Sequence, residues 1–513
     1  MRVITAEITT GLLGGMLALT AGAQTSQAGQ WTTAQQNPAR DGWQHQADGI
    51  SPQSVRNFQL LWKVDTHDKH MQLAGQDQPL IVKSGDRTLA IVAGARSNVT
   101  AIDLNTGAIV WQTHMKWSSS VPETPADQAP AGFICQNANI DVPVYDSSKD
   151  VIYIIAQDGY LHTLSVKTGD EVGTPFMATP RPYPKVNALQ LRDNVIYTIQ
   201  GQGCNGNPNL LYVINLTTRK MTMNMPHESG MWGTWGAAMG DHGNLYAGSG
   251  DGVYDASKLL LPTSVLKMSP AGKIIDYYSM PWHIFMTLRD EDLGYTPIVV
   301  HFQGKEYVVA SGKEGRFYVL NSNSIGGANH ETAEYITPLL DNIGWNFQGQ
   351  GQWGGGASWT APDGTVWVVS PFGGRTNPAT HFQYSHGPNP DGGIMALKFE
   401  MRNGKAILVP VWRSVDMQTA QPPGIAGGVV FALAGGDFTG QGDDMNGGLL
   451  SAQVRLRRAS PAVLYALDAE TGKVLWDSGH EINSLVHQGG LAVADGKVVL
   501  GSNNGIVYCY GLK

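Results

Sequence analysis

One eleven-residue pattern, A-x-D-x-x-T-G-x-x-x-W, occurs twice in this chain and limits the possible folds more than any other feature. The two copies span residues 101–111 and 466–476. An alternating apolar strand runs into each copy, and the Asp and the Thr-Gly pair make a tight turn into a second strand that ends in Trp. Each copy therefore predicts a β-hairpin with one aromatic side chain. Repeated hairpins of this size cannot each bury an apolar face alone, which indicates a stacked or radial array.

Weaker copies of the hairpin bring the number of units to eight. They occupy residues 161–171, 212–220, 265–273, 315–322, 393–398 and 504–510. The last unit has no strand after it, whereas the apolar segment 58–65 has no partner strand before it. Pairing these two would close a ring of eight four-stranded sheets and remove its open edge.

The composition supports a single all-β domain over residues 24–513. The chain has 63 Gly and 27 Pro and shows no long helical period, as expected of many short strands joined by turns. Length alone would suggest more domains, but a closed ring of this size needs most of the chain. Charged residues make up 15%, and the net charge of −8 is not gathered in a run. We therefore expect small-molecule or protein partners and no nucleic acid.

Residues 1–23 are predicted to be a secretory signal peptide. They contain Arg2, an apolar run and the ending Ala21-Gly-Ala23, which suits cleavage before Gln24. The mature protein is then expected in the periplasm or outside the cell. An uncleaved anchor is the alternative, but the apolar run is too short to span a bilayer, and no other segment approaches a membrane span.

The three cysteines, Cys135, Cys204 and Cys509, are an odd number for an exported protein. At least one thiol should therefore stay free, and Cys509 lies on an alternating apolar strand as a small core residue would. The chain has no C-x-x-C-H motif for covalent haem. If the protein is a redox enzyme, its electrons must leave through a separate acceptor, such as a cytochrome or a quinone.

The hairpin repeat, the opening segment 31–42 and the glycine-rich ending 489–505 together resemble quinoprotein dehydrogenases of the pyrroloquinoline quinone (PQQ) type. The similarity covers nearly all of the mature chain. It implies an eight-bladed β-propeller in which the Trp of each repeat docks into a neighbouring blade. It also implies that PQQ binds in the central funnel and that an alcohol or sugar hydroxyl is oxidised there.

The family places its cofactor on a Trp floor and binds calcium beside it. In the segment Trp232-Gly-Thr-Trp235, Trp235 is the better match to that floor, and the alternative is an aromatic residue that packs between blades. Asp251 stands where the family has a calcium-binding Asn. Its carboxylate could hold a divalent cation, or it could belong to an ordinary β-turn.

Two further positions match the family's catalytic residues. Asp292, in the acidic stretch 290–292, resembles the catalytic Asp and would act as general base; the alternative is a solvated acidic turn. Lys313, between two glycines and before a strand, resembles the cation that donates to the quinone oxygens. Its alternative is an exposed loop lysine.

Two positions depart from the family. Where its alcohol-oxidising members have adjacent cysteines over the quinone, this chain has Cys135 alone, and where they have a calcium-binding Glu it has Cys204 or Asn205. The resemblance places both cysteines in the funnel near the cofactor, so we hypothesise a Cys135–Cys204 disulfide, with two separate thiols as the alternative. Asn205 would be a substitute metal ligand, and the missing Glu puts bound Ca²⁺ in doubt.

Two functions compete at this point. The first is an exported PQQ-dependent dehydrogenase of alcohols or sugars, and the second is a cofactor-free propeller that binds a protein or polymer as a periplasmic scaffold. A propeller hydrolase is less well supported, because neither His301 nor His487 belongs to a nucleophile motif. We interpret the run 353–359 as packing, His487 as the end of a turn at the funnel rim, and the loops 329–348 and 435–448 as candidate funnel caps or partner-binding loops.

Overall fold

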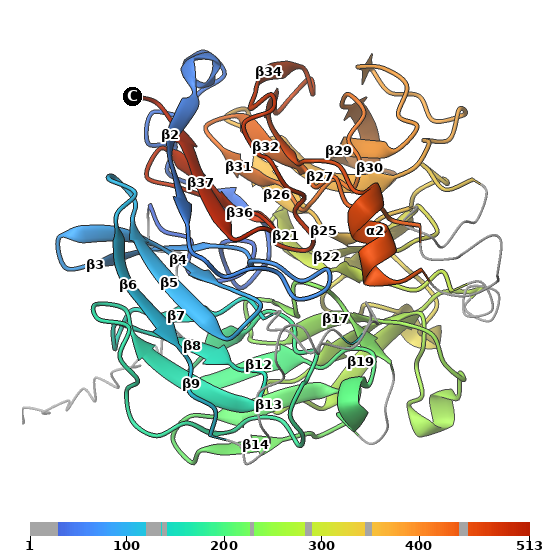
Figure 1. Cartoon of the computed structure of the whole chain (residues 1–513). Coiled ribbons are helices and arrows are strands. Elements are labelled where there is room, and N and C mark those ends of the chain that lie inside the picture. Colours follow the sequence, from blue (N-terminus) through green and yellow to red (C-terminus); the bar gives the residue numbers. More distant parts are fainter. Residues whose placement is uncertain are drawn as a thin grey trace, which may run out of the picture.

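The computed structural model describes residues 29–118, 135, 141–225, 230–282, 290–343, 351–440 and 450–513. The predicted signal peptide, residues 1–23, lies outside this part. The described chain forms eight blades, each a sheet of four or five strands, that follow one another around a ring, so the colours pass in order around the molecule (Figure 1). The predicted eight-bladed β-propeller is confirmed.

The first four blades are antiparallel sheets built in chain order. Blade 1 contains β3 (Leu80–Ser84), β4 (Arg87–Ala93), β5 (Asn98–Asp103) and β6 (Ile109–His114). Blade 2 contains β7 (Val144–Asp146), β8 (Val151–Ile155), β9 (Tyr160–Ser165) and β10 (Phe176–Met177). Blade 3 contains β11 (Gln190–Arg192), β12 (Val195–Ile199), β13 (Leu211–Asn215) and β14 (Lys220–Thr222). Blade 4 contains β15 (Met231–Trp232), β16 (Ala238–Met239), β17 (Leu245–Ser249), β18 (Ser264–Met268) and β19 (Ile274–Ser279).

The last four blades continue the ring and include the N-terminal strands. Blade 5 contains β21 (Ile298–Phe302), β22 (Lys305–Ser311), β23 (Phe317–Asn321) and β24 (Tyr335–Ile336). Blade 6 contains β26 (Ala357–Thr360), β27 (Val366–Gly373), β28 (Tyr384–Ser385), β29 (Gly392–Arg402) and β30 (Lys405–Arg413). Blade 7 contains β1 (Trp43–Gln44), β31 (Gly424–Ala426), β32 (Val429–Ala434), β33 (Val463–Asp468) and β34 (Val474–Asp477), and blade 8 contains β2 (Gln59–Asp65), β35 (Leu491–Ala494), β36 (Lys497–Gly501) and β37 (Ile506–Gly511).

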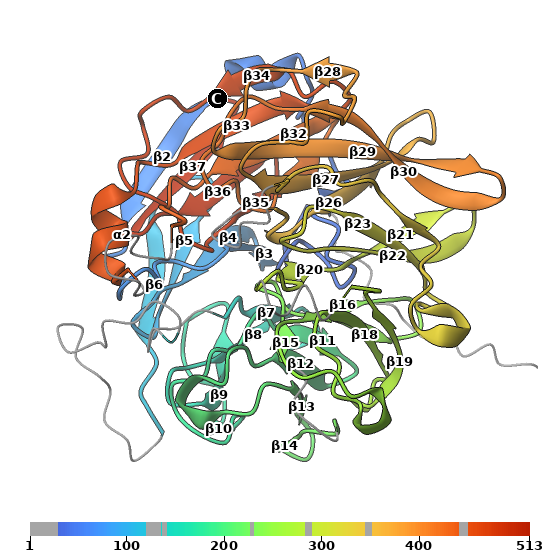
Figure 2. The same cartoon turned by 90° about the vertical axis from the view of Figure 1, so that its right-hand side faces the viewer.

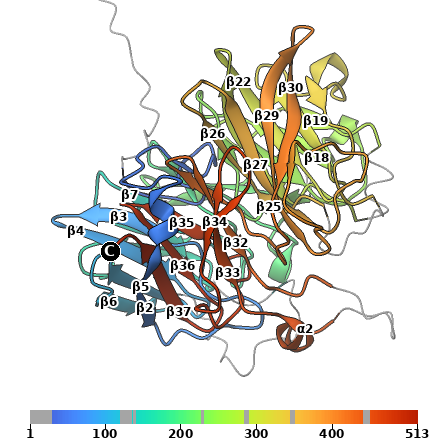
Figure 3. The same cartoon turned by 90° about the horizontal axis from the view of Figure 1, so that it is seen from above.

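Few other elements occur in the described chain. The hairpin of β29 and β30 extends past the neighbouring strands (Figure 2), and the short helix α2 (Ala452–Arg458) lies outside the sheets (Figure 3). Strands β20 (Tyr295–Thr296) and β25 (Gly354–Gly355) form a small parallel pair. The 3-10 turns are η1 (Ser54–Asn57), η3 (Cys204–Gly206), η4 (Ala256–Lys258) and η5 (Gly327–Asn329). No helix among the described residues has the length and apolar composition to cross a membrane.

The glycine of the repeat's Thr-Gly turn packs against an indole of the preceding blade. Trp111 of blade 1 donates its ring N–H to the carbonyl of Val166, 2.8 Å away, in blade 2. Its ring lies against Gly169, where an added Cβ would come within 2.5 Å of the indole at a φ of +75°. Glycine is required on both counts. The sequence therefore encodes the contact between blades as well as the turn.

The same docking occurs at two other junctions. Trp62 of blade 8 bonds the carbonyl of Leu104 and packs on Gly107, and Trp412 of blade 6 bonds the carbonyl of Ala469 and packs on Gly472. The expected tryptophan docking is therefore present in the structure.

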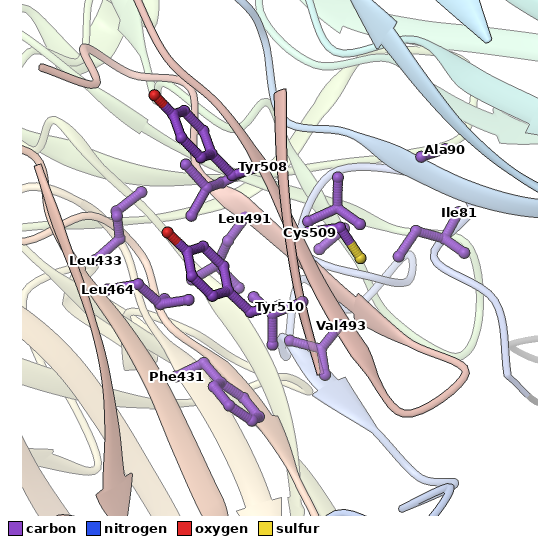
Figure 4. Packing of buried hydrophobic residues seen from close by; sticks show 14 of the residues in the cluster. Ile81, Ala90, Phe431, Leu433, Leu464, Leu491, Val493, Tyr508, Cys509 and Tyr510 are labelled. Carbon is purple, nitrogen blue, oxygen red and sulfur yellow. The ribbon is translucent and has the colours of Figure 1, made fainter. Parts of the chain in front are cut away.

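Strand β2 closes the ring as predicted. It pairs antiparallel with β37, and Trp62 lies opposite Cys509. Alternate residues of β37 contact different neighbours, since successive side chains of a strand point to opposite faces. Figure 4 shows Cys509 pointing toward Ile81 of blade 1, while Tyr508 and Tyr510 point to the other side. Cys509 is the free, fully buried core thiol that the sequence predicted.

Candidate functional site

Residues from blades 3 to 7, together with the segment that leads into blade 8, line one cavity of about 390 Å³. Its lining runs from Lys185 to Gln488 in sequence, so segments more than half the chain apart meet there. Segments of so many successive blades can share one cavity only near the axis of the ring. The charged and aromatic residues of its wall are Lys185, Trp232, Asp251, Asp290, Asp292, Lys313, Trp353, Phe372, Asp437, Arg455 and His487.

A cation and three carboxylates form the centre of this wall. The Nζ of Lys313 lies 3.0 Å from Oδ1 of Asp290 and 3.1 Å from Oδ1 of Asp292. Asp251, Asp290 and Asp292 each offer an oxygen within 4.8 Å of the others. Lys313 is 5% and Asp292 9% exposed, so neither belongs to a solvated loop. The structure thus brings together three of the sequence-predicted site residues and adds Asp290.

Backbone contacts fix these groups in place. Lys313 follows β22, and its N–H donates to the carbonyl of Asp292 at 3.2 Å. The carbonyl of Lys313 lies against Gly351, where a Cβ would approach within 1.9 Å. Asp251 follows β17, and the preceding Gly250 donates to the carbonyl of Gly230 at 2.7 Å. The cluster is therefore held by strand ends and glycine contacts, which favours a preorganised site.

Two of the three carboxylates, those of Asp251 and Asp292, have raised pKa values. Although Asp251 keeps contact with solvent, burial in the wall and the charges of Asp292 and Asp290 raise its pKa to about 8. Burial also raises the pKa of Asp292, against the opposing effect of Lys313. For Lys313, burial lowers the pKa, but the charges of Asp292 and Asp290 outweigh it and the net pKa is raised. The ammonium therefore stays charged, and the surplus negative charge favours either a shared proton or a bound cation.

Two indoles form the aromatic part of the wall. Trp232 and Trp353 have ring centroids 5.8 Å apart and planes tilted by 49°. Gly294 lies between them, because a Cβ there would approach the Trp232 Nε1 within 2.2 Å and the Trp353 ring within 2.9 Å. At Gly201, in the preceding blade, an added Cβ would lie 3.5 Å from the Trp232 ring, which is an ordinary contact distance. Gly294 is therefore the glycine that leaves room for the Trp232 indole.

The predicted floor residue Trp235 lies outside the cavity lining. It is 1% exposed and packs in the core cluster that includes Ala34 and Ala188. Its ring contacts Gly354 and Gly490. Trp235 therefore occupies the alternative role, packing between blades, and the indole at the cavity is Trp232. Both belong to the short segment 232–235, whose bends the sequence pattern does not reveal.

Asn205, the predicted substitute metal ligand, is not among the cavity-lining residues. It is exposed on η3, and its amide donates to the carbonyl of Pro182 at 2.6 Å. In the cavity, Asp290 is a third carboxylate beside Asp251 and Asp292, in a site where the family's calcium-binding Glu is missing.

The hypothesised disulfide is present. Cys135 and Cys204 are bonded, with Cα atoms 5.4 Å apart. Neither is among the residues that line the cavity, so their predicted contact with the cofactor stays a prediction. The bond does tether η3, and Gln202 and Asn209 on either side of η3 do line the cavity.

A second charged group lies on the wall. The carboxylate of Asp437 accepts from His487 Nδ1 at 2.7 Å and from Arg455 at 2.9 Å, and its side chain is 3% exposed. His487, predicted from the sequence to end a turn at the funnel rim, thus lines the cavity. His301 instead lies exposed beside Asp241, 2.8 Å away.

Several wall residues were missed because no local pattern marks them. Lys185 comes from the loop before β11, and Arg455 from α2, far from any family motif. Trp353 was interpreted as packing because no P-loop Lys follows the glycines of the run 353–359 and the run matches the start of an inner strand. The start of the loop at 435 did contain a usable signal, since Asp437 is an acid in a long glycine-rich loop that was already a candidate funnel cap. Residues 441–449 of that loop lie outside the described chain.

Solved structures with a similar fold include alcohol and methanol dehydrogenases. The chain aligns over 96% of its length with 81% of the quinohemoprotein alcohol dehydrogenase of Comamonas testosteroni, at 15% identity and a TM-score of 0.59. It aligns over 95% with 98% of a europium-containing methanol dehydrogenase, at 15% identity and a TM-score of 0.60. The chain has the quinoprotein dehydrogenase fold.

This fold does not by itself carry the activity. A computationally designed protein, Ika8, aligns with 88% of the chain at a TM-score of 0.50 and 13% identity. No protein-family model and no curated protein matches the sequence. Within the quinoprotein dehydrogenase fold, function must therefore be argued from the cavity.

Proposed function

We propose that this protein is an exported quinoprotein-like dehydrogenase that oxidises an alcohol or sugar hydroxyl with PQQ and passes the electrons to a separate acceptor. The observation that carries the proposal is the group of Lys313, Asp290 and Asp292 beside the indole of Trp232 in one cavity. A protein that only binds a partner has no need of a buried cation and three converging acids. The export and the acceptor, a cytochrome or a quinone, rest on the sequence alone.

The residues present fit a flat, anionic quinone. A volume of about 390 Å³ is within the usual range for small-molecule sites. The Trp232 indole offers a flat apolar face, bounded by Gly201 and Gly294. Lys313 and Arg455 supply positive charge on the wall. Trp232 would hold the ring, and Lys313 would donate to an oxygen of the quinone.

The carboxylates also fit a cation. Asp251, Asp290 and Asp292 converge within 4.8 Å and offer hard oxygen ligands, which suit Ca²⁺. Burial first, and then the charges of Asp292 and Asp290, raise the pKa of Asp251, and a bound cation would offset both effects. Three ionised carboxylates and the Lys313 ammonium leave two negative charges, which a divalent ion would balance. A trivalent ion is a second candidate because one of the aligned structures is a europium-containing enzyme.

PQQ, when bound, would be the two-electron acceptor. Residues of the chain would transfer the proton and stabilise the developing charge. The carboxylate of Asp292 would take the proton of the substrate hydroxyl as its carbon loses hydride. The ammonium of Lys313 would stabilise the negative charge that develops on the oxygen of the quinone carbonyl that is reduced. Its ion pairs with Asp290 and Asp292 keep it protonated for that task.

The test is reconstitution of the purified protein. PQQ is added with Ca²⁺ or with europium(III), quinone absorbance is recorded, and reduction of an artificial dye is followed over a panel of alcohols and sugars. The proposal predicts cation-dependent quinone binding and dye reduction with at least one substrate. Absence of quinone binding with every cation would contradict it and leave the alternative of a cofactor-free binding protein.

Variants make this test specific. Trp232→Ala should weaken quinone binding, whereas Trp359→Ala, an indole of blade 6 outside the cavity, should leave binding unchanged. With PQQ and the cation both at saturating concentration, Asp292→Asn should lower kcat about 100-fold or more. Equal effects of the two Trp variants on binding would place the quinone elsewhere.

A further inference from the structure

Lys185 is a second lysine on the cavity wall, and the proposed dehydrogenase chemistry does not use it. It lies before β11 in blade 3, and its backbone is fixed by a bond from the N–H of Gly201 to its carbonyl at 2.9 Å. The residue is 7% exposed and lines the cavity. Its amine therefore faces the cavity from a loop whose backbone is hydrogen-bonded to blade 3.

The surroundings of this amine differ from those of Lys313. Its Nζ donates to Oε1 of Gln202 and lies 5.4 Å from the centre of the Trp232 ring. An amide oxygen and an indole face do not fix a positive charge as two carboxylates do. Burial lowers the pKa of Lys185 to about 7, while Lys313 in the same cavity is held charged by Asp290 and Asp292.

We propose that Lys185 is a nucleophile that forms a reversible imine with a small aldehyde bound in this cavity, next to Trp232. A buried lysine in an apolar site is the usual form of an amine activated for attack on a carbonyl. The wall supplies what the ligand needs, since the Trp232 face takes an apolar aldehyde chain or ring. This assignment does not depend on quinone binding.

The reaction balances without an additional reagent. The lone pair of Nζ attacks the aldehyde carbon, an N–C bond forms, and the C=O π pair becomes a hydroxyl that takes one hydrogen of the amine. Loss of that hydroxyl with the second amine hydrogen releases water and leaves the C=N bond. Water reverses both steps, so no electrons are gained or lost. Attack requires the neutral amine, which Lys185 has and Lys313 lacks at neutral pH.

The test is reductive trapping in the full-length protein. Benzaldehyde at less than one equivalent is incubated with the protein and sodium cyanoborohydride near pH 7, and the modified peptides are identified by mass spectrometry. At this pH about half of the Lys185 amine is neutral, against less than about one in a thousand for an ordinary exposed lysine. Lower basicity reduces nucleophilicity in part, so we expect at least about tenfold enrichment at Lys185.

Lys313 is the internal control, because it shares the cavity but is held charged. Labelling of Lys185 without Lys313 supports the proposal. Labelling spread over exposed lysines with no enrichment at Lys185 overturns it, and so does equal labelling of Lys185 and Lys313. The Lys185→Arg variant should lose the selective adduct and keep the labelling of exposed lysines. Because no quinone is added, failure here would leave the dehydrogenase proposal untouched, and failure of quinone binding would leave this one.

Discussion

Lys313 and Lys185 show how strongly one cavity can separate two residues of the same type. Lys313 is charged because Asp290 and Asp292 lie 3.0 and 3.1 Å from its Nζ. Lys185 faces an amide and an indole, and burial lowers its pKa. The two therefore suit opposite tasks, one as a fixed cation and one as a neutral amine.

Removal of the Lys313 charge should destabilise the protein. Lys313→Met leaves the buried Asp292 without its cation, which costs about 3 kcal/mol, while the more exposed Asp290 adds little. Urea unfolding near pH 7 measures it. The control, Lys258→Met, breaks the exposed pair with Asp255 and should change little. Added Ca²⁺ should recover part of the loss, and equal stability of the two variants would show that the Lys313 pairs contribute nothing.

At the scale of the element, the blade junction depends on the glycine of each turn. Gly169 and Gly173 both have positive φ, +75° and +83°, in blade 2, but only Gly169 faces an indole. Gly169→Ala should therefore lower the free energy of unfolding by about 1–3 kcal/mol more than Gly173→Ala. Both substitutions strain the backbone at a positive φ, but only the alanine at 169 would collide with Trp111. Chemical unfolding of the two variants compares them, and equal losses would mean that Trp111 does not restrict the turn.

Blade 2 also contains a buried histidine that makes stability depend on pH. Burial alone would lower the pKa of His162, but contacts with Asp158 at 3.9 Å and Glu171 at 2.7 Å outweigh it and raise the pKa to about 9. Since the folded pKa exceeds the unfolded value near 6.5, the protonated histidine stabilises the fold fully below about pH 6.5. This contribution is lost as the pH rises through 9.

The size of this effect follows from the same pKa. A change from 6.5 to about 9 corresponds to about 3 kcal/mol at most. The unfolding free energy of the wild type should therefore fall between about pH 6.5 and 9 by more than that of His162→Gln. Parallel curves for the two proteins would show that His162 does not bind its proton more tightly when folded.

The sequence predicted the elements better than the site. The eight units and the closing strand could be found because the two exact copies repeat Asp, Gly and Trp at fixed spacing and the weaker copies keep part of this pattern. The Gly and Trp residues also make contacts between blades. The cavity depends on side chains from segments far apart. A family resemblance located Asp251, Asp292 and Lys313. It favoured Trp235 as the floor residue, because nothing in the local sequence shows which of the indoles of Trp232 and Trp235 faces the cavity.

For the whole molecule, the disulfide joins Cys135 to η3, two positions that are far apart in sequence. Cys135 and Cys204 are 69 residues apart in sequence, and a bridge of this span stabilises a fold by about 4 kcal/mol in the chain-entropy account. In denaturant, a thiol reagent should titrate one thiol before reduction and three after it, because Cys509 is free. The Cys135→Ser, Cys204→Ser double variant should unfold at lower urea. Three thiols in the unreduced protein would contradict the bond.

The central claim for the whole molecule is that the ring axis holds a quinone and a cation in one cavity. The direct measurement is a crystal structure of the full chain grown with PQQ and europium(III), with the metal located by its anomalous scattering. The account predicts a peak within about 2.5 Å of oxygens of Asp251, Asp290 and Asp292, and quinone density against Trp232. A metal found only at the exposed group of Asp241, His301 and Glu306, with no quinone in the cavity, would contradict it.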